Sequence, residues 1–90
     1  MSEREVFRRA IERYGEPAQM MMVAEECGEL LKECSKYLRK GKNYDKTLLM
    51  EEVVDVQIML DQIKVMCDYD DLQLDILRKE KVGRLLMRLG

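Results

Sequence analysis

The chain has 90 residues, of which 47% are hydrophobic and 38% charged, and its net charge is −2. This composition is typical of one folded domain spanning residues 1–90, and it gives no support for binding to nucleic acid or to a membrane surface. No apolar run is long enough to span a membrane and the N-terminus does not resemble a signal peptide, so we expect a cytoplasmic protein.

The first two predicted helices are bounded by residues with known preferences for helix ends. Ser2 and Glu5 have the S-x-x-E spacing of a capping box, and Gly15 is placed to end the first helix. Pro17 suits the first turn of a second helix, which we expect to run to about residue 40 and to end at Gly41.

Two further helices complete the predicted fold. The third is expected over about residues 46–67 after an N-cap at Asp45, and the fourth over about residues 71–89. Negative charge near the start of the fourth helix favours the positive end of its dipole, and it comes from Asp68, Asp70 and Asp71. The sequence therefore predicts an all-α fold, a four-helix bundle with two central helices that is completed by oligomerisation.

A second apolar strip on the third predicted helix indicates what completes the bundle. Val54, Ile58 and Val65 lie opposite the main apolar face, and a helix that is apolar on two faces is buried on two faces. A domain of this size buries only about 60% of its unfolded-chain surface, so its core is marginal. We expect a homodimer or homotetramer joined in part through this strip.

The cysteines and the absence of histidine restrict the possible chemistry. Cys27, Cys34 and Cys67 are odd in number and lack C-x-x-C spacing, which predicts buried free thiols in a reducing cytosol. Without His, neither Ser–His or Cys–His catalysis nor a His-based zinc site is possible. Any chemistry must depend on carboxylates, amines and a metal ion.

The most informative residue is Glu52, which falls inside the apolar face of the third predicted helix. A buried carboxylate is costly unless it is paired or bound to metal, and no Lys or Arg lies three or four residues away. Asp55 shares its face at i+3, and Glu26 and Glu29 repeat this spacing on the second helix. We expect these four carboxylates to converge on a hard cation, Mg²⁺ with Mn²⁺ as a substitute.

The order of these motifs resembles a known enzyme family. The run Glu25-Glu26-Cys27-Gly28-Glu29, then twenty-two residues, then Glu52-Val53-Val54-Asp55, is similar to the E-E-x-x-E … E-x-x-D signature of MazG-like nucleotide pyrophosphohydrolases. The resemblance implies Mg²⁺-dependent hydrolysis of a nucleoside triphosphate to the monophosphate and pyrophosphate.

Carried over by position, the resemblance also implies roles for single residues. Glu26, Glu29, Glu52 and Asp55 would be both metal ligands and catalytic residues, and Gln19, Lys81 and Arg84 would contact the substrate. Lys81 and Arg84 are equally consistent with solvated charges on a terminal helix. There is no Trp or His to stack on a base, so the preferred base stays open.

Two alternatives stand beside this interpretation. A phosphoribosyl-ATP pyrophosphatase is a helical enzyme of similar size, but the Ser-Tyr-Thr-like stretch expected before its first helix is missing here. A non-catalytic helical interaction module would show no Mg²⁺ dependence and would tolerate loss of the Glu52 charge. The burial of Glu52 among apolar positions argues against such a module.

Overall fold

The computed structural model describes residues 1–90 and contains four α-helices and no strand. The helices are α1 (Glu3–Tyr14), α2 (Glu16–Lys40), α3 (Lys46–Met66) and α4 (Asp71–Leu89), with a short 3-10 turn, η1 (Gly41–Asn43), after α2. The predicted all-α class and the four helices are therefore confirmed, and none of these helices combines the length and apolar character of a membrane span.

Local capping explains where the helices begin and end. The Ser2 hydroxyl accepts a hydrogen bond from the Glu5 N–H at 3.2 Å, and the Asp45 carboxylate accepts one from the Thr47 N–H at 3.0 Å. Gly15 ends α1 with a φ of 88°, a conformation that side chains with a Cβ disfavour. The complete capping box lies at the start of α4, where Asp70 and Gln73 satisfy each other's backbone N–H groups.

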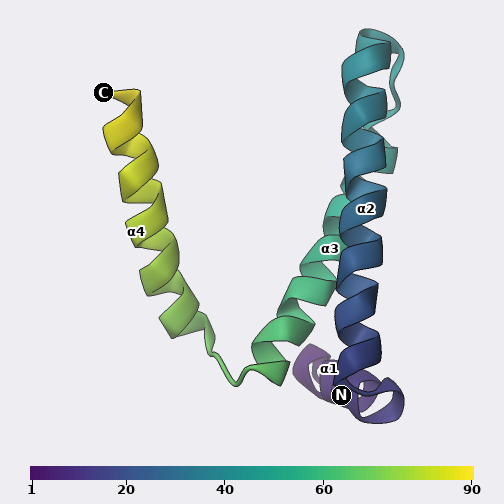
Figure 1. Cartoon of the computed structure of the whole chain (residues 1–90), viewed down its shortest axis with the longest axis vertical. Coiled ribbons are helices and arrows are strands. Elements are labelled where there is room, and N and C mark those ends of the chain that lie inside the picture. The colour runs from purple at the N-terminus through teal and green to yellow at the C-terminus, as the bar shows by residue number, and fades with distance from the viewer.

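The centre of the fold is the antiparallel pair of α2 and α3, with α1 lying across its foot (Figure 1). Gln19, near the start of α2, is buried and its Nε2 donates to Oε1 of buried Gln62, near the end of α3, at 2.7 Å. Met59 packs one turn before Gln62 and is also buried. This contact fixes how the two helices are aligned.

Helix α4 stands apart from the other three. Its first turn meets α3 through the ion pair of Asp71 with Lys64, and the rest of the helix extends away from the other three (Figure 1). The radius of gyration is 16.0 Å, whereas a compact domain of this length has a value of about 12 Å. One chain thus forms a three-helix unit with a projecting fourth helix, and the expected four-helix bundle is not formed within a single chain.

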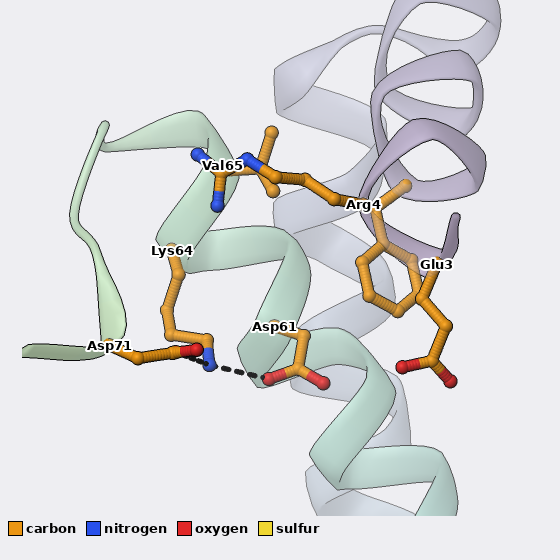
Figure 2. Close-up of a pocket in the computed structure, with 7 residues that line it drawn as sticks. Glu3, Arg4, Asp61, Lys64, Val65 and Asp71 are labelled. Atoms are coloured by element: carbon orange, nitrogen blue, oxygen red, sulfur yellow. Dashed lines mark hydrogen bonds and ion pairs between the residues drawn. The ribbon is translucent and has the colours of Figure 1, made fainter. Parts of the chain in front are cut away.

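The direction of α4 is set at its junction with α3. The Lys64 ammonium lies 2.8 Å from an Asp61 oxygen on its own helix and 3.0 Å from an Asp71 oxygen at the start of α4 (Figure 2). Both hydrogen bonds raise the pKa of Lys64, so it stays charged. Asp68 takes a left-handed φ of 58° between the helices, which Asp tolerates better than most residues.

Burial within one chain differs from the sequence expectation in two respects. Val54 and Ile58 are exposed as predicted, but Val65 is half-buried and lines a small pocket together with Phe7 of α1, so its assignment to the free strip was wrong. The cysteines are free, as expected, yet Cys34 and Cys67 are exposed and only Cys27 is half-buried. The expectation of buried thiols is therefore wrong for the single chain, because α4 covers neither position.

Candidate functional site

Three carboxylates meet between α2 and α3. Glu26 comes from α2, Glu52 and Asp55 come from α3, and one oxygen from each lies within 4.8 Å of the others. Glu26 and Glu52 are half-buried, while Asp55 is exposed. The structure thus brings together three of the four carboxylates predicted as ligands, with one side of the cluster open to solvent.

The alignment of the two helices explains why these residues meet. Glu26 follows Gln19 by seven residues, and Asp55 precedes Gln62 by seven residues. Seven residues are close to two helical turns, so Glu26 lies on the same face of α2 as Gln19, and Asp55 lies on the same face of α3 as Gln62. Because α2 and α3 are antiparallel and Gln19 bonds to Gln62, the same steps bring Glu26 opposite Asp55. Glu52 lies one turn before Asp55 on that face.

Glu52 has the most unusual environment in the cluster. Its Oε2 atom is buried and has no hydrogen-bond partner. Burial is the main cause of a raised pKa for Glu52, and the negative charges of Asp55 and Glu26 raise it further. A desolvated carboxylate with an unsatisfied oxygen, facing two other carboxylates, destabilises the folded chain unless a cation or a proton neutralises it.

Glu29, the fourth predicted ligand, is placed differently. Its side chain is exposed, and one of its oxygens lies 3.5 Å from the Lys32 ammonium on the next turn of α2. Its negative charge still contributes to the raised pKa of Glu52. Lys32 is thus a surface ion-pair partner, and Glu29 lies beside the group of three rather than in it.

A buried clasp between Glu33 and Tyr44 was not predicted from the sequence. The Tyr44 hydroxyl donates to Oε1 of Glu33 at 2.8 Å, both residues are buried, and Lys36 lies 3.3 Å from the other Glu33 oxygen. The bond from Tyr44 lowers the pKa of Glu33, while burial and the Glu33 carboxylate raise the pKa of Tyr44 to about 12. The clasp ties the end of the α2–α3 connection to α2.

The spacing of Glu33 offered a partial signal for this clasp. Glu33 continues the face of Glu26 along α2, but nothing in the sequence connects it to Tyr44, which follows the turn. The Tyr37 and Tyr44 rings are perpendicular to each other, with 5.8 Å between ring centroids, and this contact supports the same corner. The pairing depends on how the connection folds back, which spacing alone does not give.

The predicted substrate residues do not join the carboxylates within one chain. Gln19 is buried and its amide is used by Gln62. Lys81 and Arg84 are exposed on the part of α4 that extends away from the other helices (Figure 1). Neither cation therefore lies at the cluster in this structure.

The donor set of the cluster fits a hard divalent cation. All three groups offer carboxylate oxygens, which Mg²⁺ and Mn²⁺ prefer and zinc and copper do not. A cation would also satisfy the buried Glu52 oxygen that has no protein partner. Comparison of the chain with protein-family models, curated proteins and solved structures finds no match. The functional argument therefore rests on the site itself.

Replacing Glu52 with Gln tests whether its charge is a cost in the metal-free protein. The folded-state pKa of Glu52 is raised above its ordinary value of 4.5, so the folded chain holds this proton more tightly than the unfolded chain. The contribution of protonated Glu52 to the free energy of unfolding is fully present below pH 4.5. It is lost as the pH rises through the folded-state pKa of Glu52. We expect Glu52→Gln in excess chelator to melt at the same temperature as wild type or higher, by a margin that grows above pH 4.5.

The matched control for this experiment is Glu51→Gln. Glu51 precedes Glu52 on α3 but is exposed and lies outside the cluster. We expect Mg²⁺ to raise the melting temperature of wild type and Glu51→Gln, and to raise that of Glu52→Gln less, because a ligand that binds only the folded state stabilises it more when it binds more tightly. An equal Mg²⁺ shift in all three proteins would contradict a site built around Glu52.

Titration of the tyrosines tests the clasp. We expect the phenolate absorbance of the wild type to show one group ionising near pH 12, because burial and Glu33 disfavour the Tyr44 phenolate. Tyr44→Phe should remove this late step, whereas Tyr37→Phe, at the adjoining ring, should retain it. A late step that survives in Tyr44→Phe would show that another tyrosine is the protected one.

Proposed function

We propose that the chain is a Mg²⁺-dependent nucleoside triphosphate pyrophosphohydrolase of the MazG-like kind, which releases the monophosphate and pyrophosphate. The observation that carries the proposal is the buried Glu52 oxygen without a partner, placed within reach of Glu26 and Asp55 between α2 and α3. The order and spacing of the two motifs support the same reaction class.

In this proposal the residues of the cluster have defined tasks. Glu26, Glu52 and Asp55 hold the metal, and Glu29 joins them by leaving its exposed ion pair with Lys32. Such exposed pairs contribute little to stability, so the exchange costs little. When bound, Mg²⁺ would neutralise negative charge on the phosphates and activate the attacking water. A carboxylate not fully engaged by the metal accepts the proton of the attacking water.

Residues outside the cluster bind or position the substrate. Lys81 contacts the phosphates as a point charge, and Arg84 contacts them through its two-pronged guanidinium. The bond from Gln19 to Gln62 supports a role for Gln19 in aligning α2 with α3, rather than in touching the nucleotide. The Glu33–Tyr44 bond holds the other end of the same pair of helices.

We also propose that the bundle is completed in a homodimer or homotetramer. Only Tyr44 and Met59 are buried among the apolar residues, while Val54 and Ile58 are 51% and 40% exposed. Exposed apolar area of this extent along a helix marks an interaction surface. The strip defined by Val54 and Ile58 on α3, called the α3 strip, borders Asp55, so the proposed interface would lie beside the site.

Light scattering tests the proposed assembly. We expect wild type to be a dimer or tetramer at micromolar concentration, and Val54→Asp with Ile58→Asp to dissociate, because two charges would be desolvated in the interface. Gln57→Asp is the matched control, since Gln57 is an exposed polar neighbour of Ile58 on α3. A monomeric wild type would refute the assembly.

A nucleotide panel tests the reaction. Standard, deoxy, uracil-containing, oxidised and methylated triphosphates are incubated with Mg²⁺, and pyrophosphate and orthophosphate are measured separately. We expect pyrophosphate as the first product, retained activity with Mn²⁺, and none in excess chelator. Glu52→Gln should lose most of the activity while Glu51→Gln retains it. Sustained turnover in chelator, or orthophosphate as the first product, would refute the proposal.

A further inference from the structure

The second half of α4 is charged differently from the rest of the chain. Residues 76–90 contain one acidic residue, Glu80, and five basic ones, namely Arg78, Lys79, Lys81, Arg84 and Arg88. Five positive charges and one negative charge give this segment a net charge of +4. Because the whole chain carries −2, residues 1–75 together carry −6. The net charge of the whole chain therefore conceals a strongly basic segment, and such segments attract acidic partners.

The last turns of α4 also expose a wide apolar surface. From Val82 to Leu89 every large apolar side chain is more than half exposed, and Leu86 and Leu89 reach 68% and 76%. At about 100° per residue these side chains are spread over about 200° of the helix circumference, and no charged residue interrupts them. They belong to Val82, Leu85, Leu86, Met87 and Leu89. We call this surface the α4 apolar side, and nothing within the chain covers it.

Basic side chains stand at both edges of the α4 apolar side. Arg84 lies about 60° around the helix from Met87, while Lys81 and Arg88 lie within about 60° of Leu85 at the other edge. None of these three cations forms an ion pair within the chain. The end of α4 is therefore amphipathic, with unpaired cations on either side of an uncovered apolar surface.

A lipid surface with acidic headgroups matches both properties. A cationic amphipathic helix lies in the plane of such a surface, with its apolar side at the acyl chains and its cations at the headgroups. The long aliphatic stems of Lys and Arg let their charged ends reach the headgroups beside an inserted apolar side. None of the helices is long and apolar enough to cross a membrane, so α4 would lie along the surface.

Other partners match only one of the two properties. Nucleic acid offers phosphates to the cations, but its backbone offers no cover for five large apolar side chains. A second α4 offers apolar area, but it would bring cations against cations. Packing on one helix typically covers an apolar stripe about 100° wide, so it would leave much of the α4 apolar side in water. A lipid surface can cover all of it.

The shape of the chain keeps its acidic part away from such a surface. Apart from the ion pair of Asp71 with Lys64, α4 extends away from the other helices, and its last turns lie far from them (Figure 1). Exposed charges are largely screened beyond about 8 Å at physiological ionic strength. The net charge of −6 on residues 1–75 therefore opposes the docking of residues 82–89 only weakly.

We infer that α4 docks through residues 82–89 on a lipid surface rich in acidic headgroups. Val82, Leu86 and Leu89 contact the acyl chains, and Arg84 and Arg88 contact the headgroup phosphates. This inference goes beyond the proposed function and does not depend on the carboxylate cluster. Arg84 is also a proposed substrate contact, so Arg88 and the two leucines are the residues to vary.

Co-sedimentation of the full chain with vesicles tests the docking. We expect wild type to bind vesicles of phosphatidylcholine with phosphatidylglycerol at least about tenfold more tightly than pure phosphatidylcholine, and less tightly as salt is raised. Leu86→Gln with Leu89→Gln should abolish binding, and Arg88→Gln should weaken it about fivefold. The matched control is Leu31→Gln with Leu38→Gln on α2, where both leucines are at least as exposed, and it should bind as wild type does.

Several results of this experiment would overturn the inference. One is a wild type that does not bind the acidic vesicles, and another is equal binding to both kinds of vesicle. A third is equal loss of binding in the α2 and α4 double variants when circular dichroism shows that both keep their helices. Binding to a DNA duplex without binding to vesicles would identify nucleic acid as the partner instead.

Fluorescence locates the contact in a chain that is otherwise unchanged. The chain has no Trp, so Leu86→Trp places a single reporter on the α4 apolar side and Leu38→Trp places one on α2. We expect acidic vesicles to shift the emission to the blue, and brominated lipid to quench it, for Leu86→Trp alone. A shift for Leu38→Trp alone, or for neither, overturns the inference. Blue-shifted emission of Leu86→Trp that is the same with and without vesicles would place α4 against a protein surface and overturn it as well.

Discussion

The alignment of α2 with α3 is the constraint on which the candidate site depends. Gln19 and Gln62 fix it at one end, and Glu33 and Tyr44 fix it at the other. All four side chains are buried, so a slip of the helices would leave several polar groups without partners, at a cost comparable to losing each hydrogen bond. The carboxylate cluster lies between these two polar contacts, so they determine how its side chains are placed relative to one another.

Polar contacts hold this alignment because the single chain has little apolar core. Three of its five buried residues are polar or charged, and only Tyr44 and Met59 are apolar. Hydrophobic contact is non-directional and permits neighbouring registers, whereas a hydrogen bond between two buried amides permits one. A small apolar core thus goes together with a well-specified register, and much of the remaining apolar surface is exposed.

Features fixed by neighbouring residues could be predicted from the sequence, and those fixed by distant ones could not. The helix ends at Gly15 and Asp45 depend on local capping and were expected. The meeting of Glu26 with Glu52 was expected because helical spacing gives the face. The Glu33–Tyr44 clasp was missed because it depends on how the connection folds back. The separation of α4 was missed because spacing gives an apolar face but not its partner.

Glu52 links the stability of the chain to its proposed chemistry. Its raised pKa means that folding pushes the carboxylate toward its neutral form, and the neighbouring acids push in the same direction. A sequence selected for stability alone would place an apolar or amide side chain there, since buried charge without a partner is a net cost. A carboxylate at this position would be stabilised by a cation bound in the cluster. A cation bound in the cluster would relieve this unfavourable charge in the folded chain alone, so metal binding and folding should favour each other.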